Sequence, residues 1–404
     1  MGLRTARRGL GRRLKLRILV VGAGVSGISA ARGLLRDGHD VAVFDQRPNV
    51  TVGGGAVTIW SNGATVLQQL GVDMAGAGQS LSTVRVTTST GRPLATMDLD
   101  TMVNRLGAPV RMVPRRVLLE RLLSGFPTDR IRSGSRAERV VDSRNGVRLD
   151  FADGSSAEGD VLIGADGLHS VVREIVGGQP AKPTGWCSWQ GLVSLPHIAE
   201  PQVATMMIGE HGNLGMWPAG GSHLQWWFDL RWSPGLVRPQ RPIEMIRSHF
   251  TGWSDMVDEV LATLTDDDLA PSPFPHFRHP IPGAGVGRLT LLGDAAHTMP
   301  PTLAQGTNQA LLDTMVLRKA LSDLPNGDGD ISSALRWYEN TRRRRVKAVS
   351  WLTTHQVSRP ESMLRPAALI PDRFMTWALT TFLAWVSHRD ISAEVSRGCL
   401  AEVR

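Results

Sequence analysis

The first ordered pattern along the chain consists of short apolar runs separated by turn residues. Residues 18–21 (Ile-Leu-Val-Val) form an apolar, β-branched run that ends at a glycine cluster, as a buried parallel strand does. A helical pattern follows over about residues 26–36, and a second apolar run at residues 41–44 ends on Asp45. The pattern predicts a strand, a helix and a second parallel strand near the N-terminus.

Later segments repeat these signals and then change character. Residues 161–163 and 289–292 are predicted strands, and residues 116–123 are a predicted helix. Between residues 176 and 280, proline and tryptophan become frequent and short alternating stretches replace helical periodicity, which predicts an inserted, mainly β domain. The most apolar stretch, residues 374–386, is too short to span a membrane, so we expect a packed C-terminal helix and no stable membrane insertion.

Composition adds one unusual feature, a formal net charge of +8. Seven of the excess positive charges lie in the first 17 residues, which contain no acidic residue, so the remainder is nearly neutral. A nearly neutral body favours an uncharged, apolar partner over nucleic acid or another polyanion. Cys187 and Cys399 lie far apart without histidine partners, so no disulfide framework and no metal site is expected, and a cytoplasmic location is the default.

The first motif lies between the two N-terminal strands and opens the predicted helix. It consists of Gly22, Ala23, Gly24, Val25, Ser26 and Gly27. The glycines allow a tight turn, a close approach of the backbone to a pyrophosphate, and close packing of the helix, whose N-terminus faces the negative charge. Asp45 ends the next strand about 20 residues later, where an acid binds a ribose hydroxyl. Together these features predict a dinucleotide site in a Rossmann-like α/β domain.

Two further motifs follow apolar strands. Asp166-Gly167 ends the strand at residues 161–163 in a Gly-Ala-Asp-Gly turn. Gly293-Asp294 follows the strand at residues 289–292 and leads through a proline pair to Gly306, Thr307 and Asn308 at the start of a helix. Asp294 is suited to accept a hydrogen bond from a polyol hydroxyl, and the helix N-terminus is suited to face a ring carbonyl or an anion.

The three motifs, in this order, resemble those of the single-component (group A) FAD-dependent aromatic monooxygenases related to para-hydroxybenzoate hydroxylase. The resemblance covers about residues 17–345 and implies that all three motifs bind one FAD. It implies that the glycine motif holds the pyrophosphate, Asp45 and Arg47 the adenosine end, Arg116 the phosphate and ribityl region, and Asp294 the ribityl chain. Asp166-Gly167 resembles a turn that serves both FAD and nicotinamide, and residues 306–308 would lie beside the flavin ring.

The resemblance also implies the domain organisation, with a GR2-type Rossmann-like FAD-binding domain. We expect a flexible basic tail at residues 1–16, a discontinuous FAD-binding domain at 17–175 and 281–345, an inserted substrate domain at 176–280, and a helical region at 346–404. Three positions depart from the family pattern: Ala304 replaces the first glycine of a Gly-Gln-Gly sequence, Leu312 replaces an acid, and Gln190 stands where many relatives have arginine.

The implied reaction is hydroxylation or epoxidation of a bulky, mostly apolar aromatic or polycyclic molecule. NADPH or NADH would reduce the flavin, and O2 would form a C4a-hydroperoxide on it, so no catalytic side chain is required. His297 is then expected to be structural, and the arginine run at 342–345 a solvated helix face. The expected pocket residues are Gly55, Trp189, Gln190, Trp217, Trp226 and Pro300, although alternating tryptophans in a sheet are more often core.

Other functions remain open at this stage. A flavin dehydrogenase or reductase would keep the same cofactor motifs, and a non-catalytic protein of the same fold would bind a partner without using the flavin. A flavin halogenase is disfavoured because the chain has four lysines, none ahead of the Asp166-Gly167 region except Lys15, and no Trp-x-Trp-x-Ile-Pro sequence. The sequence leaves the substrate, the choice of NADH or NADPH, and the oligomeric state open.

Overall fold

The N-terminal unit builds the first sheet of the protein. The computed structural model describes residues 14–391, except 52–53, 144–145, 234, 236, 281–282, 325–329, 358–364 and 389–390; the basic tail up to residue 13 and Cys399 lie outside these residues. β1 (Arg17–Val21), α1 (Val25–Arg36) and β2 (Asp40–Asp45) confirm the predicted strand–helix–strand pattern. β1 is the central strand of a parallel sheet with the order β18-β12-β1-β2-β8. The other strands are β8 (Ile131–Ser133), β12 (Val161–Gly164) and β18 (Leu289–Leu291).

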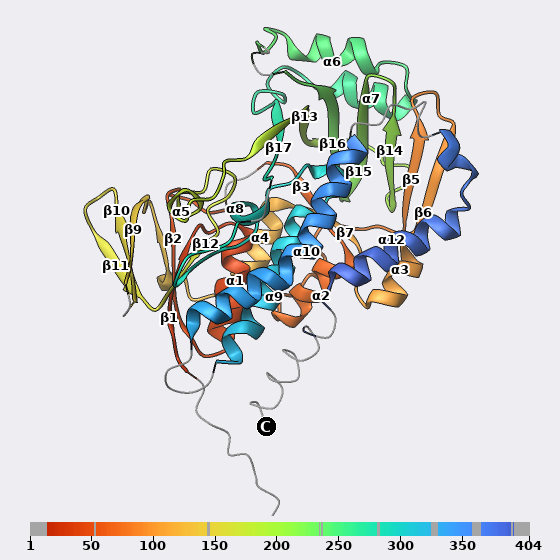
Figure 1. The fold of residues 1–404 in the computed structure, drawn as a ribbon. Coiled ribbons are helices and arrows are strands. Elements are labelled where there is room, and N and C mark those ends of the chain that lie inside the picture. Colours follow the sequence, from red (N-terminus) through yellow and green to blue (C-terminus); the bar gives the residue numbers. More distant parts are fainter. Residues whose placement is uncertain are drawn as a thin grey trace, which may run out of the picture.

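Alternating side chains of β1 anchor two layers on opposite faces of this sheet. Ile18 and Val20 pack in the cluster that contains α1 and α9 (Gly306–Ser322). Leu19 and Val21 pack toward a second, antiparallel sheet of β9 (Ala137–Ser143), β10 (Gly146–Phe151) and β11 (Ser156–Gly159). A strand covered on both faces reads as a continuous apolar run, which is why the sequence signal was clear. Figure 1 shows the parallel sheet between the two layers.

A seven-stranded sheet forms the second large unit, with the order β17-β13-β16-β15-β14-β5-β6. Its strands are β5 (Thr83–Thr88), β6 (Pro93–Asp98), β13 (Lys182–Ser194), β14 (Val203–Ile208), β15 (Gly212–Gly220), β16 (His223–Arg231) and β17 (Phe274–Arg278). α6 (Pro242–Phe250) and α7 (Asp255–Thr263) cover one face of it. β5 pairs in parallel with β14, so the boundary expected at residue 176 does not separate the strands of this sheet.

The remaining elements are helices, short 3-10 turns and the strands of a small three-stranded sheet. They are β3 (Ala56–Ile59), α2 (Ser61–Gln69), β4 (Gln79–Ser80), α3 (Leu99–Leu106), β7 (Arg111–Pro114), α4 (Arg115–Leu123), η1 (Thr128–Arg130), α5 (Val171–Ile175), α8 (Asp294–His297), η2 (Pro301–Leu303), α10 (Ile331–Val357), η3 (Arg365–Leu369) and α12 (Asp372–Val386). α12 confirms the expected C-terminal helix and docks on β6, where Thr96 N–H donates to Asp372 over 2.8 Å. Within the described part of the chain, no helix combines the length and apolarity needed to cross a membrane.

Candidate functional site

The three sequence motifs meet in space although they lie far apart in the chain. A Cβ atom added to Gly22 would lie 2.3 Å from the carbonyl oxygen of Ala165, so the first motif packs directly on the second. A Cβ on Gly293 would lie 2.2 Å from Oγ of Ser26, so the third motif packs on the first. Gly22 also has a φ of +103°, which favours glycine. The motifs therefore form one site at the carboxyl edge of the parallel sheet.

The glycines of the first motif have different surroundings. A Cβ on Gly27 would lie 1.8 Å from the carbonyl oxygen of Gly22, so this position serves close packing of α1. A Cβ on Gly24 would meet nothing within 4 Å, and Gly24 caps α1 without a side-chain hydrogen bond. Space and free N–H groups at the N-terminus of a 12-residue helix suit a pyrophosphate, so these residues fit a dinucleotide cofactor.

Asp45 is held beside this loop by several donors. The backbone N–H of Ala23 donates to its Oδ2 over 2.7 Å, and the Arg47 guanidinium makes two hydrogen bonds of 2.9 Å with the carboxylate. Burial raises the pKa of Asp45, but the bonds from Arg47 and Ala23 outweigh burial and hold the pKa below its ordinary value. Asp45 is therefore a fixed carboxylate at neutral pH.

Asp166 lies in the turn after β12 and faces the start of α5. Ser170 Oγ donates to its Oδ1 over 2.5 Å, and the Val172 N–H donates to Oδ2 over 3.3 Å. Burial raises the pKa of Asp166 above its ordinary value, with the Ser170 bond acting against it. Gly167 follows with a φ of +83°. The described contacts of Asp166 therefore shape the turn itself.

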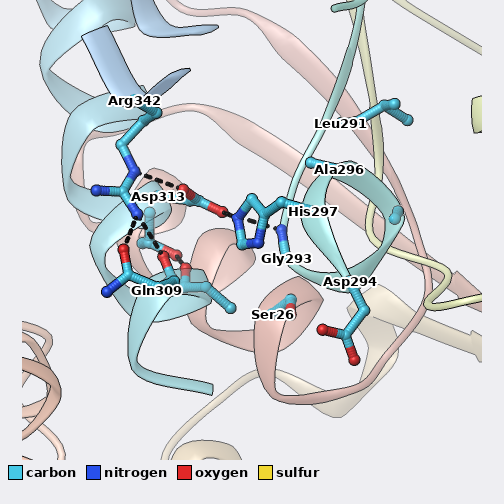
Figure 2. A network of polar contacts seen from close by, with 12 residues as sticks. Ser26, Leu291, Gly293, Asp294, Ala296, His297, Gln309, Asp313 and Arg342 are labelled. Carbon is cyan, nitrogen blue, oxygen red and sulfur yellow. Dashed lines mark hydrogen bonds and ion pairs between the residues drawn. The ribbon is translucent and has the colours of Figure 1, made fainter. Parts of the chain in front are cut away.

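A buried ionic network supports the Gly293-Asp294 turn. Asp313 of α9 is fully buried and accepts hydrogen bonds from His297 Nε2 (2.6 Å), Arg342 Nε (2.6 Å) and the Gly293 N–H (3.0 Å). Burial raises the pKa of Asp313, but His297 and Arg342 outweigh burial and hold the pKa below its ordinary value. Figure 2 shows the Asp294 carboxylate pointing away from this network. The network fixes the turn and leaves Asp294 available.

The buried contacts of Arg342 and His297 bear on two expectations from the sequence. Arg342 is only 3% exposed and is therefore not part of a solvated helix face, because its guanidinium pairs with Asp313 inside the protein. His297 is a buried part of the turn, as expected, but it does have a partner in Asp313. The sequence shows four adjacent arginines and cannot show which one turns inward.

The start of α9 is organised by Asn308. Its buried side chain accepts from the Trp60 N–H over 3.0 Å and donates to the carbonyl oxygens of Thr58 and Ala304. Ala304 is in the left-handed region with a φ of +48°, at the position where a glycine is usual in the resembled family. The Asn308 side chain is thus committed to the protein, whereas Gly306 and Thr307 border a cavity.

A cavity of about 1760 Å³ extends from Asp294 and the start of α9 to the seven-stranded sheet. The expected site residues that line it are Arg47, Gly55, Arg116, Gln190, Trp217, Asp294, Gly306 and Thr307. Arg116 is 67% exposed and pairs with Glu120 of its own helix. The arginines that line the cavity, Arg47, Arg115 and Arg116, lie at the end near Asp45 and α4. This end combines open space with positive charge.

Three expected pocket residues do not line this cavity. Trp189 and Trp226 are fully buried on the opposite face of the sheet, in the cluster with α6 and α7, and Pro300 is buried beside two lining residues, Met299 and Pro301. Successive side chains of a strand alternate between faces, so Trp226 and Trp227 point in opposite directions. Trp227 lines the cavity instead.

Sequence reasoning also missed two other parts of the cavity wall. Trp60 lies at the start of α2, donates from Nε1 to the Leu303 carbonyl oxygen over 3.1 Å, and packs edge-on against Trp217 with 6.3 Å between ring centroids. Trp217 in turn packs against Trp227 at 5.7 Å. α12 contributes Met375, Ala378, Leu379, Phe382 and Leu383. No local signal marks these residues, because their position depends on contacts between distant segments.

Comparisons with known proteins identify the family to which the chain belongs. The model of the family described as "FAD binding domain" matches residues 15–352. A 3-amino-4-hydroxybenzoate 2-monooxygenase from Streptomyces platensis is 34% identical over 355 residues, covering 82% of this chain and 85% of that enzyme. An FAD-dependent urate hydroxylase from Klebsiella oxytoca is 32% identical, covering 82% of this chain and 87% of that enzyme. A Klebsiella pneumoniae protein crystallised with FAD and uric acid has a TM-score of 0.82 and 26% identity, covering 91% and 97% of the two chains.

Proposed function

Since the chain belongs to the FAD-binding domain family that includes aromatic flavoprotein monooxygenases, we propose that it is a cytoplasmic enzyme that oxygenates a bulky, mostly apolar aromatic molecule. The observation that carries the proposal is the cavity that joins Asp294 and the start of α9 to a tryptophan-lined wall. In the balanced reaction, the substrate, O2, NAD(P)H and a proton give the oxygenated product, NAD(P)⁺ and water. The relatives named above act on aminohydroxybenzoate or urate, which supports an aromatic substrate class.

The residues at the motif end have complementary roles in this proposal. Gly24 and the N-terminus of α1 hold the pyrophosphate of FAD, while Asp45 and Arg47 bind its adenosine end. Asp294 accepts from a ribityl hydroxyl, and the N–H groups at Gly306 and Thr307 face the flavin ring, with Arg116 near the phosphates and Asp166-Gly167 at the turn beside them. Bound FAD, once reduced, would supply the chemistry that reacts with O2.

The residues at the other end bind the substrate and exclude water. Trp60, Trp217 and Trp227 offer flat apolar surfaces on which an aromatic ring packs. Nearer the motif end, Gly55, with a φ of +75°, leaves room where a side chain would approach Gln225. No acid or base from the chain is required for this step, because the substrate need only be positioned and water kept out.

Two variants test the cofactor end. Asp294→Ala is expected to weaken FAD binding and abolish turnover while leaving the urea midpoint of the apoprotein near that of the parent, because Asp294 is exposed and points away from the buried network. Gly24→Val is expected to do the same, since its side chain would fill the open space at the loop. Unchanged FAD content in both variants would refute the assigned contacts.

Turnover is tested by screening aromatic compounds for those that accelerate NADPH or NADH oxidation by the FAD-loaded protein. Incorporation of ¹⁸O from ¹⁸O2 into the product, in step with NAD(P)H consumed, is the expected result. NAD(P)H oxidation that yields only hydrogen peroxide with every compound would favour a flavin reductase. A purified protein that retains no FAD would favour a non-catalytic binding protein.

A further inference from the structure

The far end of the cavity carries a row of polar side chains on the seven-stranded sheet. Ser188 on β13 and Asn213 on β15 are both register partners of Asp229 on β16, and all three line the cavity. Asp229 lies two residues beyond Trp227 and four beyond Gln225, whose side chain contacts Ala56 near the motif end. At about 3.3 Å per residue, the row lies about 13 Å along the strand from Gln225.

Asp229 is a buried carboxyl held in a defined orientation. It is 5% exposed, and Ser188 Oγ donates to its Oδ1 over 2.5 Å. The same hydroxyl lies 2.6 Å from Nε2 of His276, which therefore donates to Ser188. Burial lowers the pKa of His276 to about 4, so this ring is neutral at pH 8 and brings no positive charge. Ser188 and His276 thus orient Asp229 without compensating its charge.

Two acceptors among the described residues at this end have no donor. Among the described residues none donates to Oδ2 of Asp229, and Oδ1 of Asn213 is buried without a partner. Asp267 and Asp268 also line the cavity, from the exposed loop that leads into β17, whose Phe274 pairs with Ser188. In the part of the chain that the structure describes, no lysine or arginine lines this end of the cavity, since the arginines of the lining are Arg47, Arg115 and Arg116 at the other end. Burial raises the pKa of Asp229 to about 7, as expected for a carboxyl that lacks a cation.

We propose that this end of the cavity is a subsite for a primary ammonium group on the substrate, bound by Asp229 and Asn213. An ammonium carries three N–H donors and a positive charge, which match the two free acceptors and the carboxylates around them. The tryptophan wall lies between this subsite and the cofactor end, so the amine lies on the far side of the ring system from the position that is oxygenated. The inference rests on the proposed function, because it treats the cavity as the substrate site.

The test compares three rigid two-ring probes that differ only in the terminal group. They are 4-(aminomethyl)biphenyl, 4-biphenylmethanol and biphenyl-4-carboxylate, titrated calorimetrically into the FAD-loaded protein at pH 8, where the amine is protonated. The parent protein is expected to bind the amine at least tenfold more tightly than the alcohol, and the carboxylate most weakly. Equal affinities, tighter binding of the alcohol or the carboxylate, or no binding of the amine would overturn the proposal.

Variants then assign the preference to the named residues. Asp229→Asn preserves the shape and is expected to reduce the preference for the amine over the alcohol to less than threefold with FAD content unchanged. Glu259→Gln, an equal change of charge on the exposed face of α7, is the matched control and should keep the full preference. If Asp229→Asn does not fold, Asn213→Leu should lower the preference at least threefold. A preference that survives these substitutions counts against the subsite.

Failure of this inference is distinguishable from failure of the proposed function. A protein that retains no FAD fails the proposed function before the probes are compared. A protein that contains FAD and oxygenates an aromatic compound, yet binds the amine and the alcohol equally, overturns the ammonium subsite alone.

Discussion

Replacing Arg342 with methionine removes a guanidinium that is buried against Asp313. Methionine keeps much of the length and apolar volume of the side chain but makes none of its hydrogen bonds. In the parent protein, Arg342 donates to Asp313 Oδ1 over 2.6 Å and to the carbonyl and side-chain oxygens of Gln309 over 3.1 and 2.7 Å. Asp313 would then keep only His297 and the Gly293 N–H as partners.

The expected cost follows from the burial of both groups. Asp313 is 0% and Arg342 3% exposed, and removing one partner of a buried ion pair costs about 3–5 kcal/mol because the other charge stays buried without full compensation. A whole domain is stable by only about 5–15 kcal/mol, so this is a large fraction. Asp313→Asn leaves the opposite charge uncompensated and should cost a similar amount. The double variant leaves neither charge and should be more stable than the sum of the two losses implies.

Urea denaturation of the FAD-loaded proteins, followed by tryptophan fluorescence, measures these losses. Arg344→Met is the matched control, since Arg344 lies on the same helix and is exposed, and its loss should stay within about 0.5 kcal/mol. The two single variants and the double variant form a cycle with an expected coupling of about 2–3 kcal/mol. A coupling near zero, or equal losses for Arg342→Met and Arg344→Met, would refute the assignment of a buried pair.

Four further substitutions test which face of the sheet lines the cavity, the backbone strain at Ala304 and the ionisation of Asp229. Trp189→Ala should lower the unfolding free energy, measured by urea denaturation, by about 3–5 kcal/mol and have little effect on the binding of aromatic ligands. Trp227→Ala should lower the unfolding free energy less and weaken the binding of aromatic ligands, measured by calorimetry, about tenfold. Ala304→Gly relieves a φ of +48° and should raise the unfolding free energy by about 1 kcal/mol; a loss in denaturation would contradict the strain. Burial raises the pKa of Asp229 to about 7, so between about pH 4 and 7 this carboxyl is protonated in the folded protein and ionised in the unfolded chain. As pH rises through this range, the unfolding free energy of the parent should therefore fall by up to about 4 kcal/mol relative to that of Asp229→Asn. A difference in urea midpoint between the parent and Asp229→Asn that does not change with pH would refute the raised pKa of Asp229.

Local sequence patterns were sufficient to predict the strands, helix and glycine loop of the nucleotide-binding half. A parallel strand covered on both faces is a continuous apolar run, and the glycines at its end stand where the backbone requires them, so residues 17–45 can be interpreted without tertiary information. The convergence of Gly22, Asp166 and Asp294 needed the resemblance as well, because nothing local brings segments more than 100 residues apart together.

The substrate end depended on contacts that the sequence does not encode locally. The alternation of side chains along a strand predicts that Trp226 and Trp227 lie on opposite faces of the sheet, but it does not predict which face packs against helices and which face borders a cavity. That choice follows from α6 and α7 covering one face of the sheet, while β5 and β6 extend the sheet from a distant segment. The buried Arg342 shows the same limit, because its partner Asp313 lies on another helix.

Net charge and local charge lead to different conclusions about the substrate. With seven of the eight excess charges in the first 17 residues, the remaining body is nearly neutral, which by itself favours an uncharged substrate. Inside the cavity, however, the charges are separated: arginines lie near the glycine loop, and Asp229, Asp267 and Asp268 lie at the far end. A ligand responds to charges within about 10 Å more than to the sum over the molecule. A neutral body is therefore compatible with a phosphate-bearing cofactor at one end of the cavity and a cationic substituent at the other.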